Sequence, residues 1–117
     1  MARRDITGAV DFAYLEDFAA GETEVVDKVL SLFQEQAALW GVMLDETHDG
    51  WRDAVHTLKG AARGVGAVNL GDVCERTEAR GPAGLGDVRH ALALALADIA
   101  AYTHERALRS LKGGPPP

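Results

Sequence analysis

One histidine in this chain, His56, lies in a setting that suits chemistry. Residues 55–67 read VHTLKGAARGVGA. Wound as an α-helix, this stretch places an apolar face on one side and His56, Gly60 and Gly64 on the other. Each glycine inside a helix costs about 1 kcal/mol relative to alanine, so the bare surface needs an explanation. The simplest explanation is the close approach of another protein to His56.

Two cations accompany this histidine. Lys59 follows His56 by one turn and Arg63 follows it by two turns, so both flank the imidazole. An exposed imidazole is mostly neutral at pH 7 and has a lone pair that can attack phosphorus. The spacing therefore predicts a site at which a nucleophilic nitrogen receives an anionic group, with Lys59 suited to phosphate oxygens as a mobile charge.

The bulk composition excludes several classes of function. The chain has 117 residues, 47% of them hydrophobic and 26% charged, which fits one globular domain. A net charge of −6 without a basic stripe argues against nucleic acid as a partner. No apolar stretch is long enough to span a membrane. The single cysteine, Cys74, fits a reducing compartment, so a cytoplasmic protein is expected.

Other catalytic and binding motifs are not found in the sequence. No serine stands in a nucleophile elbow, and no glycine-rich loop could hold ATP. His48, His90 and His104 are interpreted as surface residues, because no histidine pair has the four-residue spacing of a helical metal site. Asp45 and Glu46, beside His48, are explained as well by a turn as by a weak metal site. We therefore expect no metal and no cofactor bound by the chain itself.

Hydrophobic periodicity predicts an all-α fold. The run of alternating Ala and Leu at 91–97 could suggest a strand, but both residues are good helix formers and poor strand formers. Short connections between helices favour an antiparallel four-helix bundle with a short additional N-terminal helix. The loop after the fourth helix is expected at 81–86. The expected helices are 11–20, 22–46, 51–66, 70–80 and 87–112.

Domain organisation is predicted to be simple. Residues 1–10 show no periodicity and are expected to be a flexible arm, 11–112 are expected to form the bundle, and the Gly/Pro-rich 113–117 are expected to be a disordered tail. The core is expected to draw apolar side chains from every helix, among them Phe12, Leu15, Phe18, Val25, Trp40, Trp51, Leu108 and Leu111.

The run His-Thr-Leu-Lys-Gly at residues 56–60, followed by Val65-Gly66-Ala67, resembles the signature of histidine-containing phosphotransfer (HPt) domains. That signature fixes the His, the following Lys and both Gly residues. Outside it, the similarity is one of helix pattern and extends from about Phe12 to about Leu111. The resemblance implies a four-helix bundle whose exposed His takes a phosphoryl group from a receiver-domain aspartate and passes it to another.

The resemblance also assigns roles at the site. It makes His56 the phosphoacceptor through Nε2, which requires the proton to stay on Nδ1. Glu78 corresponds to a Glu that hydrogen-bonds the His ring in the similar domain of the chemotaxis histidine kinase, and a carboxylate there would fix the tautomer. A solvated Glu78 on a charged helix face is an equally good interpretation. Lys59 matches the family pattern, and Gly60 would give clearance to an incoming receiver domain.

Docking residues are less defined by the sequence. Arg63 is expected to steer an acidic partner or to be a plain surface residue, and Gly64 departs from the small Ser or Ala common at its position in similar domains. An apolar patch around the His is expected on the two long helices that precede the fourth, with charge at its rim. Candidates from the short first helix are Phe18, Ala19 and Ala20.

The predicted function is that of a phosphorelay carrier. The phosphoryl group would pass from a receiver-domain aspartate to His56 and then to a second receiver aspartate, with no autonomous ATP-dependent kinase activity. The partners would be the receiver domains of a hybrid histidine kinase and of a response regulator, and these would supply the acidic pocket and the Mg²⁺. The carrier itself is expected to be a monomer.

Three alternatives stay open at the level of sequence. The chain could be a phosphoacceptor domain of a larger kinase. It could also be a helical bundle that binds receivers or kinases and regulates signalling without accepting phosphate, although such a module would not need His56, Lys59 and Gly60 together. A metal-binding or purely structural bundle would explain the helices and leave the glycine face unexplained.

Overall fold

The computed structural model describes residues 7–113, and within them the chain forms five α-helices and no strand. The expected all-α class is confirmed. The first helix begins where the Asp11 carboxylate accepts a hydrogen bond from the Tyr14 amide. The helices are α1 (Phe12–Phe18), α2 (Thr23–Gly41), α3 (Trp51–Val65), α4 (Val68–Arg80) and α5 (Leu85–Gly113), with a 3₁₀ turn at Pro82–Gly84 before α5.

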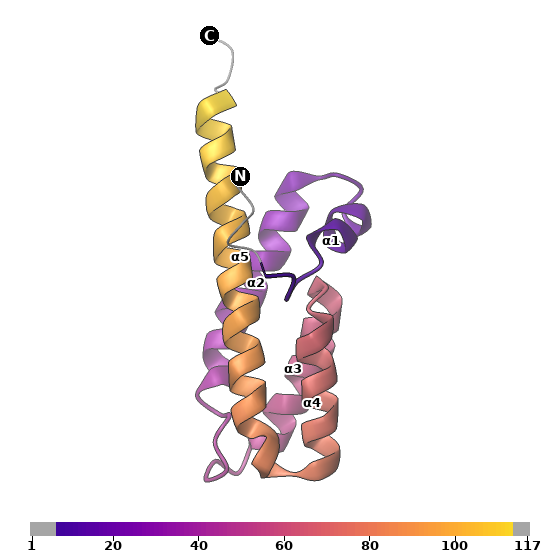
Figure 1. The fold of residues 1–117 in the computed structure, drawn as a ribbon, viewed down its shortest axis with the longest axis vertical. Coiled ribbons are helices and arrows are strands. Elements are labelled where there is room, and N and C mark those ends of the chain that lie inside the picture. Colours follow the sequence, from indigo (N-terminus) through magenta and orange to yellow (C-terminus); the bar gives the residue numbers. More distant parts are fainter. Residues whose placement is uncertain (1–6, 114–117) are drawn as a thin grey trace.

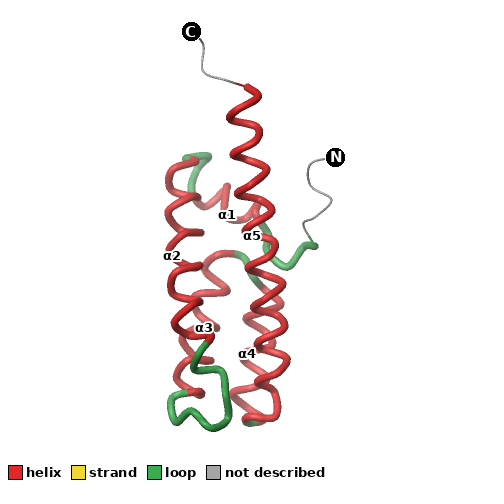
Figure 2. Tube along the Cα trace, turned by 90° about the vertical axis from the view of Figure 1, so that its left-hand side faces the viewer, coloured by secondary structure: helices red, strands yellow, loops and turns green. Residues whose placement is uncertain are grey.

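Helices α2 to α5 form the antiparallel bundle, and α1 crosses one end of it (Figures 1 and 2). The closest pair is α3 and α4, which lie side by side as a hairpin (Figure 1). Gly66 makes that hairpin possible. It has a φ of 88°, and a Cβ at this position would lie 2.7 Å from the backbone oxygen of Asp11. The second glycine of the sequence motif therefore ends α3 and lets the chain pass closely.

Several helix ends differ from the expected ones. Helix α2 ends at Gly41 instead of near residue 46, because the chain leaves the helix through turns in which the Asp45 carboxylate accepts hydrogen bonds from Thr47. Helix α5 begins at Leu85, inside the stretch expected to be a loop. Pro82 starts the 3₁₀ turn that leads directly into this helix.

The described part of the N-terminal segment differs from the flexible arm expected at residues 1–10. Residues 7–10 are not loose, because the buried carboxylate of Asp98 on α5 accepts hydrogen bonds from the amides of Thr7, Ala9 and Val10. Residues 1–6 lie outside the described residues. At the other end, Gly113 is the last residue of α5 instead of the first of the tail, and 114–117 are also outside the described residues.

The core fills the space between the four long helices. Leu30, Leu58, Leu70 and Ile99 are almost fully buried there, and Trp40 and Trp51 are half-buried against them. Four predicted core residues are instead exposed: Phe18, Val25, Leu108 and Leu111. The last two lie near the C-terminal end of α5, the end of this helix that extends past the others in Figure 1.

Candidate functional site

His56 lies on the exposed face of α3. Its side chain is 67% exposed, whereas the neighbouring Val55 and Leu58 on the opposite face are fully buried. The amphipathic pattern of α3 thus anchors the helix through its apolar side and leaves the imidazole in solvent. Because α3 pairs most extensively with α4, a side chain on α4 is well placed to orient the imidazole.

Glu78 on α4 orients the imidazole. Its Oε2 lies 2.8 Å from His56 Nδ1, and its Oε1 lies 2.8 Å from Lys59 Nζ. The pKa of Glu78 is lowered, first by the hydrogen bond with Lys59 and also by the one with His56, while burial opposes the shift. The group is therefore a carboxylate at neutral pH and can only accept, so Nδ1 carries the proton. The lone pair is then on Nε2, the nitrogen that faces away from this contact.

The ammonium of Lys59 does not extend freely into solvent. It is paired with Glu78, and the Lys59 side chain is only 22% exposed. The sequence predicts a mobile charge for phosphate oxygens. In the structure, this charge first stabilises the ionised form of the carboxylate that contacts His56.

The two glycines of the exposed face are open to solvent. Apart from the adjacent backbone of α3, a Cβ added to Gly60 or to Gly64 would meet no atom of the described residues within 4 Å. Packing within the described chain therefore does not require glycine at either position. We still predict that glycine at these two positions gives another protein room to approach His56.

Arg63 connects α3 to α4. Its guanidinium lies 2.9 Å from a carboxylate oxygen of Glu75 and 3.3 Å from one of Asp72, and these two acids, Glu75 first, raise its pKa. The arginine stem also lies over Gly71, where a Cβ would approach Arg63 Cγ to 2.8 Å. Sequence reasoning missed these α4 partners, although two acids three residues apart on the next helix of a hairpin were a usable signal.

An apolar groove lies beside the glycine face, between α1, α2 and α3. Among its large apolar side chains, Phe18 is 71% exposed and Leu32 is 54% exposed. Of the docking candidates from α1, only Phe18 lines the groove, because Ala19 is buried and Ala20 follows the helix with a positive φ. The groove is lined by Phe18, Val29, Leu32, Phe33, Gln36, Ala61, Gly64 and Val65.

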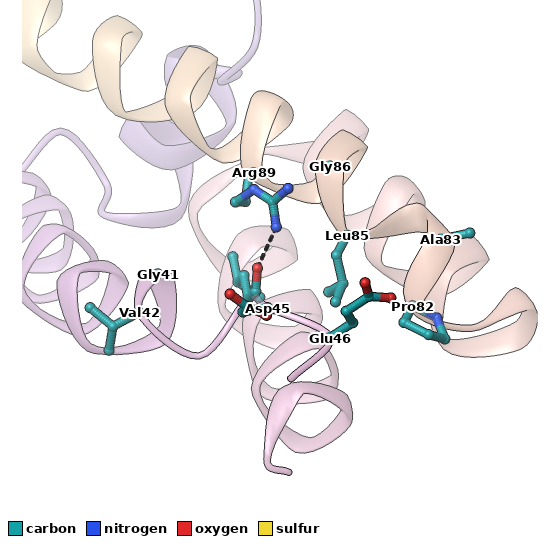
Figure 3. Close-up of a pocket in the computed structure, with 10 residues that line it drawn as sticks. Gly41, Val42, Asp45, Glu46, Pro82, Ala83, Leu85, Gly86 and Arg89 are labelled. Atoms are coloured by element: carbon teal, nitrogen blue, oxygen red, sulfur yellow. Dashed lines mark hydrogen bonds between the residues drawn. The ribbon is translucent and has the colours of Figure 1, made fainter. Parts of the chain in front are cut away.

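Another pocket lies at the end of the bundle where α2 ends and α5 begins (Figure 3), and no residue of α3 lines it. There Arg89 donates a hydrogen bond to the backbone oxygen of Leu44. Asp45, a possible metal ligand by sequence, is engaged with Thr47, whose hydrogen bonds lower its pKa. His48 Nδ1 accepts from the Gly50 amide. These residues are explained by the turn that they build.

Comparison with known proteins shows the family of the chain. The family model of the Hpt domain matches residues 14–102, which include His56 and Glu78. This chain belongs to the Hpt domain family. The crystal structure of the histidine phosphotransferase ShpA from Caulobacter crescentus is similar to this Hpt chain, with 71% sequence identity and a TM-score of 0.83. The match covers 89% of the present chain and 99% of ShpA.

No curated protein matches this Hpt chain. Within residues 7–113, none of the helices combines the length and the apolar character that a membrane span requires. In this Hpt chain, Glu78 contacts the imidazole of His56. The sequence motif pointed to His56, and the family resemblance pointed to Glu78.

Proposed function

We propose that this Hpt protein is a phosphohistidine carrier of a multistep phosphorelay. A receiver-domain aspartate would give its phosphoryl group to His56, and His56 would give it to a second receiver aspartate. The observation that carries the proposal is the 2.8 Å contact between Glu78 and His56 Nδ1, on a side chain that is 67% exposed. It leaves Nε2 with a free lone pair on the solvent side of the bundle.

The transfer step follows from this tautomer. The Nε2 lone pair attacks the phosphorus of the aspartyl phosphate, an N–P bond forms, and the P–O bond to the aspartate breaks with its electron pair going to the leaving carboxylate. No proton has to move, because Nδ1 keeps its hydrogen. The ring gains positive charge in this step, and the Glu78 carboxylate beside Nδ1 balances it.

Lys59 supports the same step. Its ammonium keeps Glu78 ionised, and its flexible stem allows the charge to move to a phosphoryl oxygen once His56 is modified. Phosphoryl transfer depends mainly on positioning and charge neutralisation. The partner receiver would supply the rest, namely its aspartate, its acidic pocket and Mg²⁺, and the carrier would have no kinase activity with ATP.

The receiver would dock on the exposed face of α3 and in the apolar groove. Gly60 and Gly64 present no side chain there, so a partner backbone can approach closely, and Phe18 and Leu32 offer apolar area for burial. A role for Arg63 in steering is weaker, because Asp72 and Glu75 already neutralise its charge.

The experiment is transfer of labelled phosphate from a phosphorylated receiver domain, with Mg²⁺, to the wild type, to His56→Gln and to His90→Gln as a matched exposed histidine. We expect acid-labile, base-stable label on the wild type and on the His90 variant and none on the His56 variant. Label on His56→Gln would overturn the assignment of the acceptor. ATP-dependent self-labelling of the purified protein would overturn the carrier role.

A further inference from the structure

Arg52 makes a contact with α4 that the proposed chemistry has not yet used. It precedes His56 by one turn of α3, on the same side of the helix. Its Nη1 donates a hydrogen bond, 2.6 Å long, to the backbone oxygen of Glu78. Its guanidinium also lies over the ring of Trp51, 4.6 Å from the ring centroid. Arg52 thus bridges the two helices at the residue that holds the imidazole.

The backbone oxygen of Glu78 needs such a donor. In a continuing α-helix, it would accept a hydrogen bond from the amide four residues later. That residue is Pro82, which has no N–H, and α4 ends at Arg80. The Gly81 amide is already used, since it donates to Thr77. The last turn of α4 therefore has an open carbonyl with partial negative charge, and the Arg52 cation satisfies it.

We infer that Arg52 is a positioning residue for phosphotransfer, acting on His56 through Glu78. Glu78 is then held at three points: His56 and Lys59 contact its carboxylate, and Arg52 contacts its backbone. The two carboxylate contacts fix the side chain, whereas Arg52 fixes the end of α4 on which this side chain is mounted. The inference rests on the proposed function for its kinetic consequence, while its structural consequence concerns the unmodified protein.

The test uses the full chain with Arg52→Met, which keeps an apolar stem on Trp51 and removes the donor. Arg52→Lys keeps a cation that can still donate, and Arg76→Met removes the charge of an exposed arginine elsewhere on α4. ¹⁵N NMR of the His56 ring in unphosphorylated protein reports the tautomer. We expect Arg52→Met to give a mixture of tautomers, Arg52→Lys to restore part of the wild-type pattern, and Arg76→Met to leave it unchanged.

Transfer rates from a phosphorylated receiver then locate the effect. Loss of one charge-assisted hydrogen bond at an exposed site predicts a rate about fivefold lower for Arg52→Met. In a Glu78→Ala background, where no carboxylate reaches His56, the same substitution should have no further effect. A full additional loss in that background would mean that Arg52 contacts the phosphoryl group or the partner directly, and would overturn the inference. An unchanged tautomer in Arg52→Met would overturn it as well.

The failure of this inference is distinguishable from the failure of the proposed function. If the wild type accepts no phosphate, the carrier role is wrong, and the ring tautomer, which needs no phosphate, still decides whether Arg52 positions Glu78. Circular dichroism spectra equal to that of the wild type would show that each variant keeps its helices.

Discussion

Glu78 Oε2 lies 2.8 Å from His56 Nδ1, although 22 residues separate the two in the chain. The contact exists because α3 and α4 form an antiparallel hairpin around Gly66. It gives the imidazole one fixed tautomer and one exposed nitrogen, and it makes α4 as important for the site as the helix that carries the histidine.

Removal of the Glu78 carboxylate should slow phosphotransfer without unfolding the protein. We expect Glu78→Ala to lower the transfer rate about tenfold, as loss of a group that orients a histidine does elsewhere. Glu78→Gln should lie between Glu78→Ala and the wild type, because its amide oxygen can still accept from Nδ1 but brings no charge. Rates measured with a phosphorylated receiver would check this order. A wild-type rate in Glu78→Ala would show that the contact has no part in transfer.

Removal of the Lys59 ammonium should raise the pKa of Glu78. This pKa lies below its ordinary value of 4.5 mainly because of the hydrogen bond with Lys59. A ¹³C NMR titration of the Glu78 carboxyl carbon should therefore show a higher pKa in Lys59→Met than in the wild type. Lys28→Met, which removes an exposed lysine of α2, is the control and should leave the titration unchanged.

The same shift predicts a pH dependence of stability. A carboxyl whose pKa is lower in the folded state than in the unfolded state stabilises the fold above the unfolded value and stops doing so as the pH falls through the folded value. The stabilising effect of Lys59 should thus be present at neutral pH and fade below about 4.5. Urea unfolding of the wild type and Lys59→Met should give curves that differ at pH 7 and converge in acid.

Substitution of Gly60 should separate stability from function. Gly60→Ala adds a methyl group to an open helix position and should stabilise the fold by about 1 kcal/mol. Gly60→Leu should stay folded and lose most of its transfer activity, because the larger side chain stands beside His56 where the partner must approach. Gly86→Ala, in the first turn of α5 and away from α3, is the control. It should transfer phosphate at the wild-type rate.

If Gly60→Leu transferred phosphate normally, the bare face of α3 would not be a docking surface. Thermal unfolding of the same samples would show whether a loss of transfer reflects a loss of structure.

The sequence was sufficient for the helices and for the imidazole. Helical periodicity predicted all five helices, and most of their ends to within a few residues. It did so because apolar stripes and the glycines Gly21, Gly66 and Gly81 are features of the nearby sequence alone. The end of α2 was missed because the apolar spacing continues through Trp40 to Leu44, whereas the hydrogen bonds from Thr47 to Asp45 that build the turn are visible only in the structure. Phe18 was placed in the core because its spacing fits the α1 stripe, but it is 71% exposed at the groove between α1, α2 and α3.

The contacts that support the site were harder to see. Arg52 binds a backbone oxygen, and such a contact depends on where α4 ends and on the missing amide of Pro82, so no pair of side-chain types reveals it. Arg63 was taken as a docking residue because its acidic partners lie on another helix. The fixed N-terminal segment was missed for a related reason, since Asp98 stands in a run of Ala and Leu and its partners are backbone amides.

Asp98 should be one of the largest single contributors to stability among the polar side chains. It is fully buried, and its two oxygens accept from the amides of Thr7, Ala9 and Val10. Asp98→Ala leaves these donors without an acceptor and should lower the free energy of unfolding by about 2–3 kcal/mol. Asp98→Asn retains one accepting oxygen and should lose less. Asp49→Ala, at an exposed turn, is the matched control and should change little.

Urea denaturation measures these differences in the free energy of unfolding. Amide hydrogen exchange shows where the structure is weakened, because the amides of Thr7 and Ala9 should exchange faster in Asp98→Ala before the bundle opens. Phosphotransfer should stay normal at temperatures where this variant is folded, since Asp98 contacts residues 7–10 and neither His56 nor Glu78. Equal stability of Asp98→Ala and the wild type would show that the segment is not held by this carboxylate. A loss of transfer in folded Asp98→Ala would instead connect the N-terminal segment to the site, through the hydrogen bond from the Asp11 amide to Gly66 at the end of α3.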